Sequence, residues 1–97
     1  MHARLVSFAA EPEIRSTAQK LAEEGASVYK AQKGFRSVIF LADDAANEYG
    51  AFSVWDSKED ADVAAAALGA RVQKEIGDKL KGAPSVRLFE VLHEAKV

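Results

Sequence analysis

The order of the apolar segments along the chain limits its fold more than any other feature. Short, largely apolar runs of strand length cover residues 3–9, 35–42, 49–55 and 86–92. Two longer segments with helical spacing, residues 13–30 and 58–81, separate the first run from the second and the third from the fourth. The polar link at residues 43–48 joins the two middle runs as a hairpin.

Local signals indicate where the two helices begin and end. Pro12, between two glutamates, predicts the first helical turn, because proline there loses only a donor that has no partner anyway. Gly34 is expected to follow the end of this helix. Ser57 is predicted to cap the second helix, with Asp60 three residues later as in a capping box.

The resulting order is strand, helix, strand, strand, helix, strand. With right-handed crossovers, this order predicts an α+β fold of the ferredoxin-like type, in which a four-stranded antiparallel sheet carries both helices on one face. The length of 97 residues fits a single domain that spans residues 1–97. A domain of this size buries roughly 60 to 65% of its unfolded surface, so it would gain stability from a partner.

Composition excludes several classes of function. The chain has no cysteine, which rules out disulfides, thiolate zinc sites and cysteine nucleophiles. A net charge of −2 argues against nucleic-acid binding through bulk charge. No apolar run approaches the roughly 18 residues of a membrane span, and the first residues do not form a signal peptide. We therefore expect a cytoplasmic protein with no membrane partner.

Both faces of the predicted strands are mostly apolar. Two helices cover only one face of such a sheet, so the other face would expose an apolar patch, which monomers rarely do. We therefore expect a homodimer that packs sheet face to sheet face and buries at least about 1,000 Å². The alternating sets are Gly50, Phe52 and Val54 against Tyr49, Ala51, Ser53 and Trp55 in the third strand, and Phe35, Ser37, Ile39 and Leu41 against Arg36, Val38 and Phe40 in the second.

The segment Val54-Trp55-Asp56-Ser57-Lys58-Glu59 and the Gly34-Phe35 entry to the second strand resemble the antibiotic biosynthesis monooxygenase family of the dimeric α/β-barrel superfamily. In that family the third strand typically ends in an aromatic residue, and x-Ser-x-Glu opens the second helix. Trp55, Ser57 and Glu59 match this pattern. The resemblance covers nearly the whole chain in layout, and its motif indicates fold more than chemistry.

The resemblance implies a protein that binds a small molecule. Proteins that resemble this family include monooxygenases that oxidise aromatic substrates without a cofactor. In that reading Tyr49 and Trp55 flank an apolar or aromatic ligand, and Arg36 or Arg87 favours its deprotonated oxygen. The sequence also offers Tyr29 and Arg4, but no spacing shows which of these side chains converge. The alternative is a non-catalytic ligand-binding or structural dimer of the same fold.

Haem degradation, another activity of such proteins, is not expected. Haem degraders of the family use an asparagine on the first strand and a tryptophan and a histidine on the second helix. The first strand of this chain has no asparagine, and Ala64 and Lys74 stand near the places of the other two.

Histidine and motif patterns add little. His93 has a side chain whose ordinary pKa suits a general base, and it is kept as a candidate ligand contact, although its place at the end of the last strand favours a solvent or interface position. Two histidines 91 positions apart, His2 and His93, predict no metal site. No Gly-x-Ser-x-Gly, Gly-x-Gly-x-x-Gly or P-loop pattern is present.

An RNA-recognition domain shares the same order of strands and helices. Its third-strand motif fits Ala51, Phe52 and Trp55, but Glu48 has the wrong charge and Tyr49 stands where glycine is needed. This interpretation is strongly disfavoured.

Overall fold

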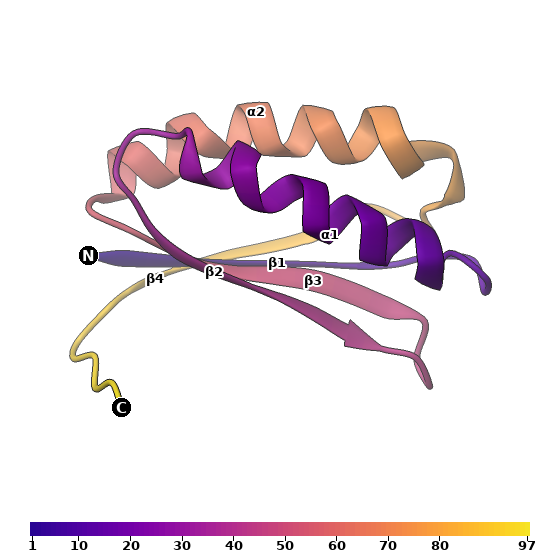
Figure 1. Cartoon of the computed structure of the whole chain (residues 1–97), viewed down its shortest axis with the longest axis horizontal. Helices are drawn as coiled ribbons and strands as arrows, with labels where there is room; N and C mark the ends of the chain where they lie inside the picture. Colours follow the sequence, from indigo (N-terminus) through magenta and orange to yellow (C-terminus); the bar gives the residue numbers. More distant parts are fainter.

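The structure is a computed structural model that describes residues 1–97. Its elements are β1 (His2–Ala9), α1 (Arg15–Lys30), β2 (Phe35–Asp43), β3 (Glu48–Trp55), α2 (Lys58–Ile76), the single 3₁₀ turn η1 (Gly77–Lys79) and β4 (Ser85–Glu90). The strands form one antiparallel sheet in the order β2-β3-β1-β4, and both helices lie over the same face (Figure 1). The predicted ferredoxin-like α+β fold is confirmed.

Helix α1 begins at Arg15, two residues later than predicted. Glu13 has a φ of 81°, in the left-handed region, so the backbone is not helical there. Pro12 lies in the turn before the helix, and the first helical turn holds no acidic residue. The expectation that Pro12 starts the helix is therefore wrong. The stop signal is in place, because Gly34 has a φ of 78° in the link between α1 and β2.

Helix α2 begins where the sequence predicts and ends earlier. The Ser57 Oγ accepts a hydrogen bond of 3.1 Å from the backbone N–H of Asp60, which confirms the predicted cap. The helix ends at Ile76, because Gly77 starts the 3₁₀ turn. Strand β4 ends at Glu90, which pairs with His2 at the start of β1. Beyond it, the Val91 N–H still donates a 3.0 Å hydrogen bond to the Met1 carbonyl oxygen.

A β-bulge at Arg36 shifts the alternation of β2. Phe35 pairs with Trp55 and Ser37 pairs with Val54, so Arg36 is an extra residue on its strand. Phe35 consequently packs against the buried Trp55, with ring centroids 5.7 Å apart, and does not share a face with Ile39. The predicted grouping of Phe35 with Ile39 is wrong for this reason.

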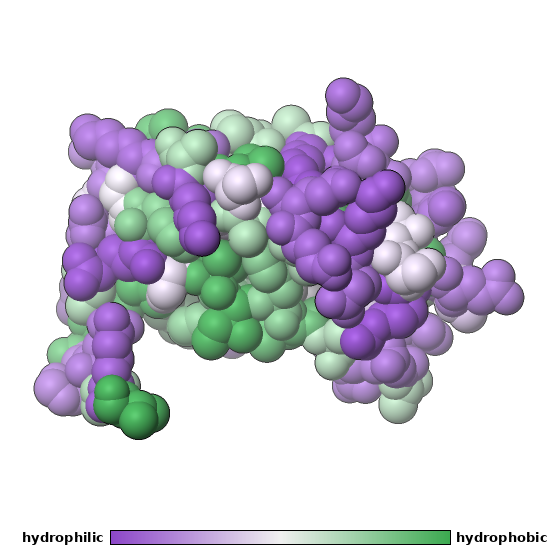
Figure 2. Space-filling view, in the orientation of Figure 1, coloured by the Kyte–Doolittle hydropathy of each residue, from purple (hydrophilic) through white to green (hydrophobic).

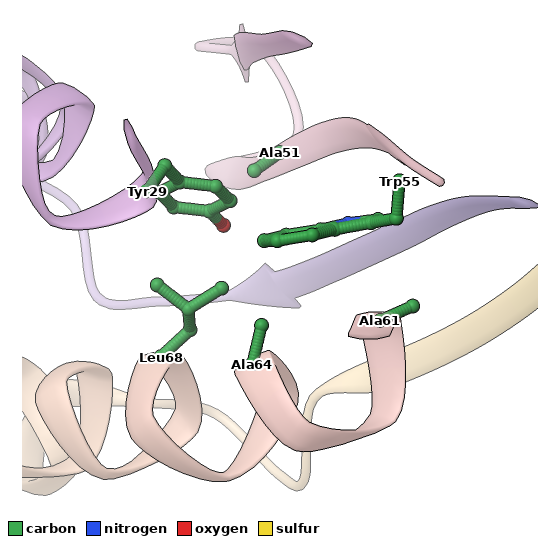
Figure 3. Close-up of a cluster of buried hydrophobic side chains, with 6 residues drawn as sticks. All are labelled: Tyr29, Ala51, Trp55, Ala61, Ala64 and Leu68. Atoms are coloured by element: carbon green, nitrogen blue, oxygen red, sulfur yellow. The ribbon is translucent and has the colours of Figure 1, made fainter. Parts of the chain in front are cut away.

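Two clusters of buried side chains fill the two ends of the layer between sheet and helices. The Trp55 cluster holds the carboxyl end of β3, and the Ile76 cluster holds its amino end. Figure 3 shows Trp55 and Tyr29 facing the small side chains of α2 in the first cluster. The Trp55 cluster consists of Tyr29, Ala51, Trp55, Ala61, Ala64 and Leu68, and the Ile76 cluster of Phe8, Ala10, Ile14, Tyr49 and Ile76.

No element covers the other face of the sheet, called here the open face (Figure 1). Three of its apolar side chains, those of Ile39, Leu41 and Phe89, are 60%, 45% and 37% exposed. The predicted exposure of an apolar sheet face is thus present in the single chain. No helix is long and apolar enough to cross a lipid bilayer.

Candidate ligand-binding site

A cavity of about 530 Å³ lies between the sheet and the two helices. It is lined from all four strands and from both helices, and 15 of its 23 lining residues are hydrophobic. Small-molecule sites typically measure about 300 to 1,000 Å³ and have mostly apolar walls with a few polar groups. The apolar walls include Val6, Ala22, Phe40, Ala51, Leu68 and Val72.

The cavity is bordered by α1 and β2 on the side that faces the viewer in Figure 2. On this side hydrophobic atoms gather in the middle of the molecule, with hydrophilic atoms around them. Ala18 and Ala22 of α1 and Phe40 and Ala42 of β2 line the cavity. Their small or apolar side chains leave the space between helix and sheet incompletely filled, whereas larger side chains close both ends of the layer.

Every charged side chain in the cavity lining is cationic. Three arginines, Arg4, Arg15 and Arg71, contribute to the lining, together with the two tyrosines of the chain, Tyr29 and Tyr49. No aspartate, glutamate, lysine or histidine is among the lining residues. The cavity therefore combines apolar walls with positive charge and two phenolic hydroxyls.

Arg4 is the most unusual of these residues. Side chains alternate along β1, so Arg4 shares the helix-covered face with Val6 and Phe8. It is only 6% exposed, it forms none of the ion pairs of the structure, and its buried Nε has no hydrogen-bond partner. A buried guanidinium without a counter-charge costs folding free energy, so its presence needs an explanation.

The other two arginines have partners. Arg71 donates through Nη1 to the carbonyl oxygen of Leu21 at 3.1 Å, and its Nη2 lies 3.7 Å from Glu24. Arg15 pairs with Asp44 at 3.1 Å in an exposed position. Both charges are thus balanced by carboxylates outside the cavity, whereas the charge of Arg4 is not.

Tyr29 connects the cavity to the Trp55 cluster. Its ring packs edge-on against Phe40, with centroids 5.4 Å apart at 87°, and lies 6.3 Å from Trp55. Burial raises the pKa of its hydroxyl above the ordinary value of 10.0, while the charge of Arg4, a hydrogen bond with Arg4 and the charge of Arg71 act in the opposite direction. A tyrosine hydroxyl is protonated at neutral pH, where it can donate a hydrogen bond, and the upward shift extends this range to higher pH.

The structure places two of the predicted site residues at or beside the cavity. Tyr49 lines it at the amino end of β3, next to Phe8, with ring centroids 6.2 Å apart. Trp55 is fully buried in its cluster and is not among the lining residues. Its indole Nε1 donates a 2.9 Å hydrogen bond to the Ser53 Oγ. A tryptophan enclosed in this way has no free face on which a ligand ring or a nucleic-acid base could stack.

The other three predicted residues lie away from the cavity. Arg36, turned outward by the bulge, pairs with Asp56 at 2.9 Å near the surface. Arg87 is on the open face, with its guanidinium carbon 4.7 Å from the centre of the Phe89 ring. His93 is exposed in the segment that follows β4. The structure therefore does not bring these side chains together with Tyr49.

Sequence reasoning named Arg4 and Tyr29 without selecting them as site residues, and it missed Arg71. A usable signal existed for Arg4, because it alternates with Val6 and Phe8 on the face whose other members are apolar. Arg71 lies directly before Val72 of the apolar stripe of α2, a position that helical periodicity does not assign clearly to either side. Nowhere does the structure group three or more His, Cys, Asp or Glu side chains as a metal would require.

The chain shares its fold with several solved structures. A protein of unknown function from Nitrosomonas europaea matches with a TM-score of 0.83 and 16% identity, over 99% of this chain and 92% of that one. A second protein from this organism, provisionally named an antibiotic biosynthesis monooxygenase, matches with a TM-score of 0.77 and 11% identity, over 96% and 100%. A variant of SnoaB, a cofactor-independent oxygenase from Streptomyces nogalater, matches with a TM-score of 0.74 and 17% identity, over 96% and 94%.

No protein-family profile and no curated protein matches the sequence. At identities of 11 to 17%, the structural likeness shows the fold alone. The resemblance to antibiotic biosynthesis monooxygenases that the Trp55-x-Ser57-x-Glu59 segment suggested is confirmed at that level: this chain has their fold.

Proposed function

We propose that the chain binds a small apolar or aromatic molecule in the cavity between its sheet and its helices. The observation that supports this most strongly is the cavity itself, which remains open between two well-packed clusters in a domain of only 97 residues. Protein interiors are normally close-packed, whereas the apolar walls of this pocket face solvent instead of other side chains. A bound molecule would restore the missing contacts.

The proposed activity is oxidation of this molecule by dioxygen without a metal or a bound flavin. In such a reaction the deprotonated substrate supplies the electrons, and the protein orients the substrate and excludes water from it. The shared fold with a cofactor-independent oxygenase supports this class of reaction. Within this chain, the apolar walls would exclude water, and Tyr49 would contact the ligand ring.

A non-catalytic ligand-binding protein is the second candidate, and one observation favours it. Abstraction of a proton from a substrate usually needs a positioned base, most often a histidine or a carboxylate. None of the lining residues carries either group. A substrate that ionises in solution before it binds would remove this requirement, so the two candidates differ in which ligands would turn over.

We also propose that two copies pack through their open faces. The chain exposes 6214 Å², whereas a folded monomer of 10.5 kDa exposes about 5,400 Å². Part of the excess comes from the C-terminal segment, which extends away from the sheet (Figure 1). The exposed Ile39 and Leu41 on the open face account for another part and suit an interface between two identical sheets.

The test is a panel of hydroxy-aromatic compounds, with binding measured by calorimetry and oxygen consumption by an electrode. Gly69 lines the cavity and a Cβ atom there meets nothing within 4 Å, so Gly69→Leu fills the space without a clash at that atom. Ala67→Leu, at an exposed position of the same helix, is the matched control.

We expect wild-type protein and Ala67→Leu to bind members of the panel and Gly69→Leu to lose most of this affinity. Oxygen consumption that Gly69→Leu abolishes would support the oxygenase. Saturable binding with no oxygen uptake would favour the non-catalytic candidate. Absence of binding, or binding that Gly69→Leu leaves intact, would contradict the proposed site.

A further inference from the structure

We infer that Arg4 binds an anionic oxygen of the ligand, so that the cavity selects apolar ring compounds that carry a carboxylate or a phenolate. This inference rests on the proposed function, since it concerns the same cavity. It goes further by assigning the charge of the ligand and the side chain that recognises it.

The first step is the environment of Arg4 in the free protein. Its side chain is 94% removed from solvent, no carboxylate pairs with it, and its Nε is an orphaned buried donor. An aliphatic side chain of similar size would fill the same space at lower cost. Arginine at this position is therefore unfavourable for the empty protein and becomes favourable when an anion occupies the cavity.

The second step is the charge balance of the cavity. Arg71 and Arg15, the other charged residues in the lining, are already paired with Glu24 and Asp44. Only the Arg4 charge remains unneutralised, and no acidic residue lines the cavity to take that role. A guanidinium in apolar surroundings attracts a carboxylate or phenolate more strongly than it would in water, because the local dielectric is low.

The third step is the neighbouring hydroxyl of Tyr29. Figure 3 shows the Tyr29 oxygen directed into the space between Trp55 and Leu68, away from the backbone of α1. Arg4 and Tyr29 both line this cavity, so one ligand can contact both groups. A protonated phenol beside a guanidinium offers two donors and no negative charge, which is an arrangement that suits an anionic oxygen.

The fourth step is that the backbone at Arg4 is held in position before any ligand arrives. Arg4 pairs with Ser53 of β3. The Ser53 Oγ donates a 3.4 Å hydrogen bond to the Arg4 carbonyl oxygen and accepts one from the Trp55 indole. This chain of contacts ties the backbone of β1 at Arg4 to the core of the molecule. A backbone fixed at this position leaves only the side-chain torsions of Arg4 to be ordered on binding, which lowers the entropy cost of recognition.

The experiment uses three probes of similar shape: p-nitrophenol, p-nitrobenzoate and the neutral nitrobenzene. We expect both anions to bind wild-type protein about tenfold to a hundredfold more tightly than nitrobenzene does. The ionised form of p-nitrophenol absorbs at longer wavelength, so its ionisation can be followed while bound. We expect the bound probe to ionise at lower pH than the free probe. A preference between the two anions identifies the carboxylate or the phenolate as the natural group.

The variants separate charge from shape. Arg4→Met is expected to lose the preference for anions while it keeps the binding of nitrobenzene, and Arg4→Lys is expected to retain part of the preference. Arg36→Met, which removes an exposed arginine outside the cavity, is the control and should bind all three probes as wild type does. The wild-type comparison of charged and neutral probes tests the inference even where a variant does not fold.

Equal affinity of wild-type protein for nitrobenzene and for the two anions would overturn the inference and leave the apolar cavity as a binding site. An anion preference that Arg4→Met retains in full would also overturn it, because another group would then hold the anion. Failure of all three probes to bind would overturn both this inference and the proposed function.

Discussion

Arg4 of β1 and Arg87 of β4 are neighbours in the sheet and lie in opposite environments. The register pairs Arg4 with Leu88 and Leu5 with Arg87, so the two arginines are one position apart and point to opposite faces. Arg87 rests on the Phe89 ring of the open face, where a cation–π contact contributes about 0.5 to 1 kcal/mol. Arg4 is buried under the helices without a carboxylate partner, and its Nε has no hydrogen-bond partner. A difference of one position in the strand register therefore places Arg87 on the surface and Arg4 in the ligand cavity.

Substitutions that remove packing on the helix-covered face should lower the free energy of unfolding more than any other change considered. Trp55→Ala is expected to lower the free energy of unfolding by about 3 to 5 kcal/mol, because the side chain is fully buried among five cluster neighbours. Trp55→Phe keeps most of the packing and should cost about 1 to 2 kcal/mol. Urea unfolding followed by circular dichroism measures both. Equal losses in the two variants would mean that the indole hydrogen bond to Ser53, and not packing, dominates.

Substitutions on the open face should change dimer formation. Ile39→Glu places a carboxylate at the most exposed large apolar side chain of the sheet. We expect it to weaken the proposed homodimer by about 3 kcal/mol, or more than a hundredfold in its dissociation constant. Sedimentation at micromolar concentration measures the assembly, with Val63→Glu on the exposed surface of α2 as the control. A wild-type chain that sediments as a monomer would contradict the proposed dimer.

The two arginines themselves give the next comparison. Arg4→Met should raise the free energy of unfolding by about 1 to 3 kcal/mol in the absence of ligand, because it replaces an uncompensated buried charge with an apolar side chain. Arg87→Met should change it by less than about 1 kcal/mol, since it removes only a surface contact. Thermal unfolding without ligand distinguishes them. Strong destabilisation by Arg4→Met would show that Arg4 has a structural partner in the folded state.

The hydroxyl beside Arg4 gives the smallest expected effect. The pKa of Tyr29 is raised on folding, so the unfolded chain ionises first as the pH rises past 10.0, and stability present below that value is lost above it. Tyr29→Phe should flatten this alkaline decline. Urea midpoints measured from neutral to alkaline pH provide the check. An identical decline in wild type and Tyr29→Phe would refute this assignment.

Short apolar runs and helical spacing were sufficient to predict the order of strands and helices along the chain, because burial leaves such patterns in each element. The cap at Ser57 was also predictable, since its hydrogen bond to Asp60 is local. The bulge at Arg36 was not, because an extra residue in one strand depends on how two strands pair. The positive φ at Glu13, which delays α1, likewise depends on how the chain turns out of β1.

The candidate site was only partly predictable for a related reason. Tyr49 could be assigned to a face by alternation, and so could Arg4. The cavity could not, because it arises where Ala18, Ala22 and Gly69 from different helices leave space over the sheet. The convergence of Arg4 with Tyr29 and Arg71 on one cavity depends on how the sheet and both helices come together, which no local pattern contains.

The central claim is that Arg4 recognises an anion inside the cavity, and its own Nε–H resonance tests this most directly. The side-chain N–H signals of Arg4 and Arg87 can be followed by nitrogen-edited NMR while p-nitrobenzoate or nitrobenzene is added. The account predicts that p-nitrobenzoate shifts the Arg4 signal strongly, that nitrobenzene shifts it far less, and that the Arg87 signal moves with neither. An Arg4 signal that stays in place at saturating p-nitrobenzoate would contradict the account.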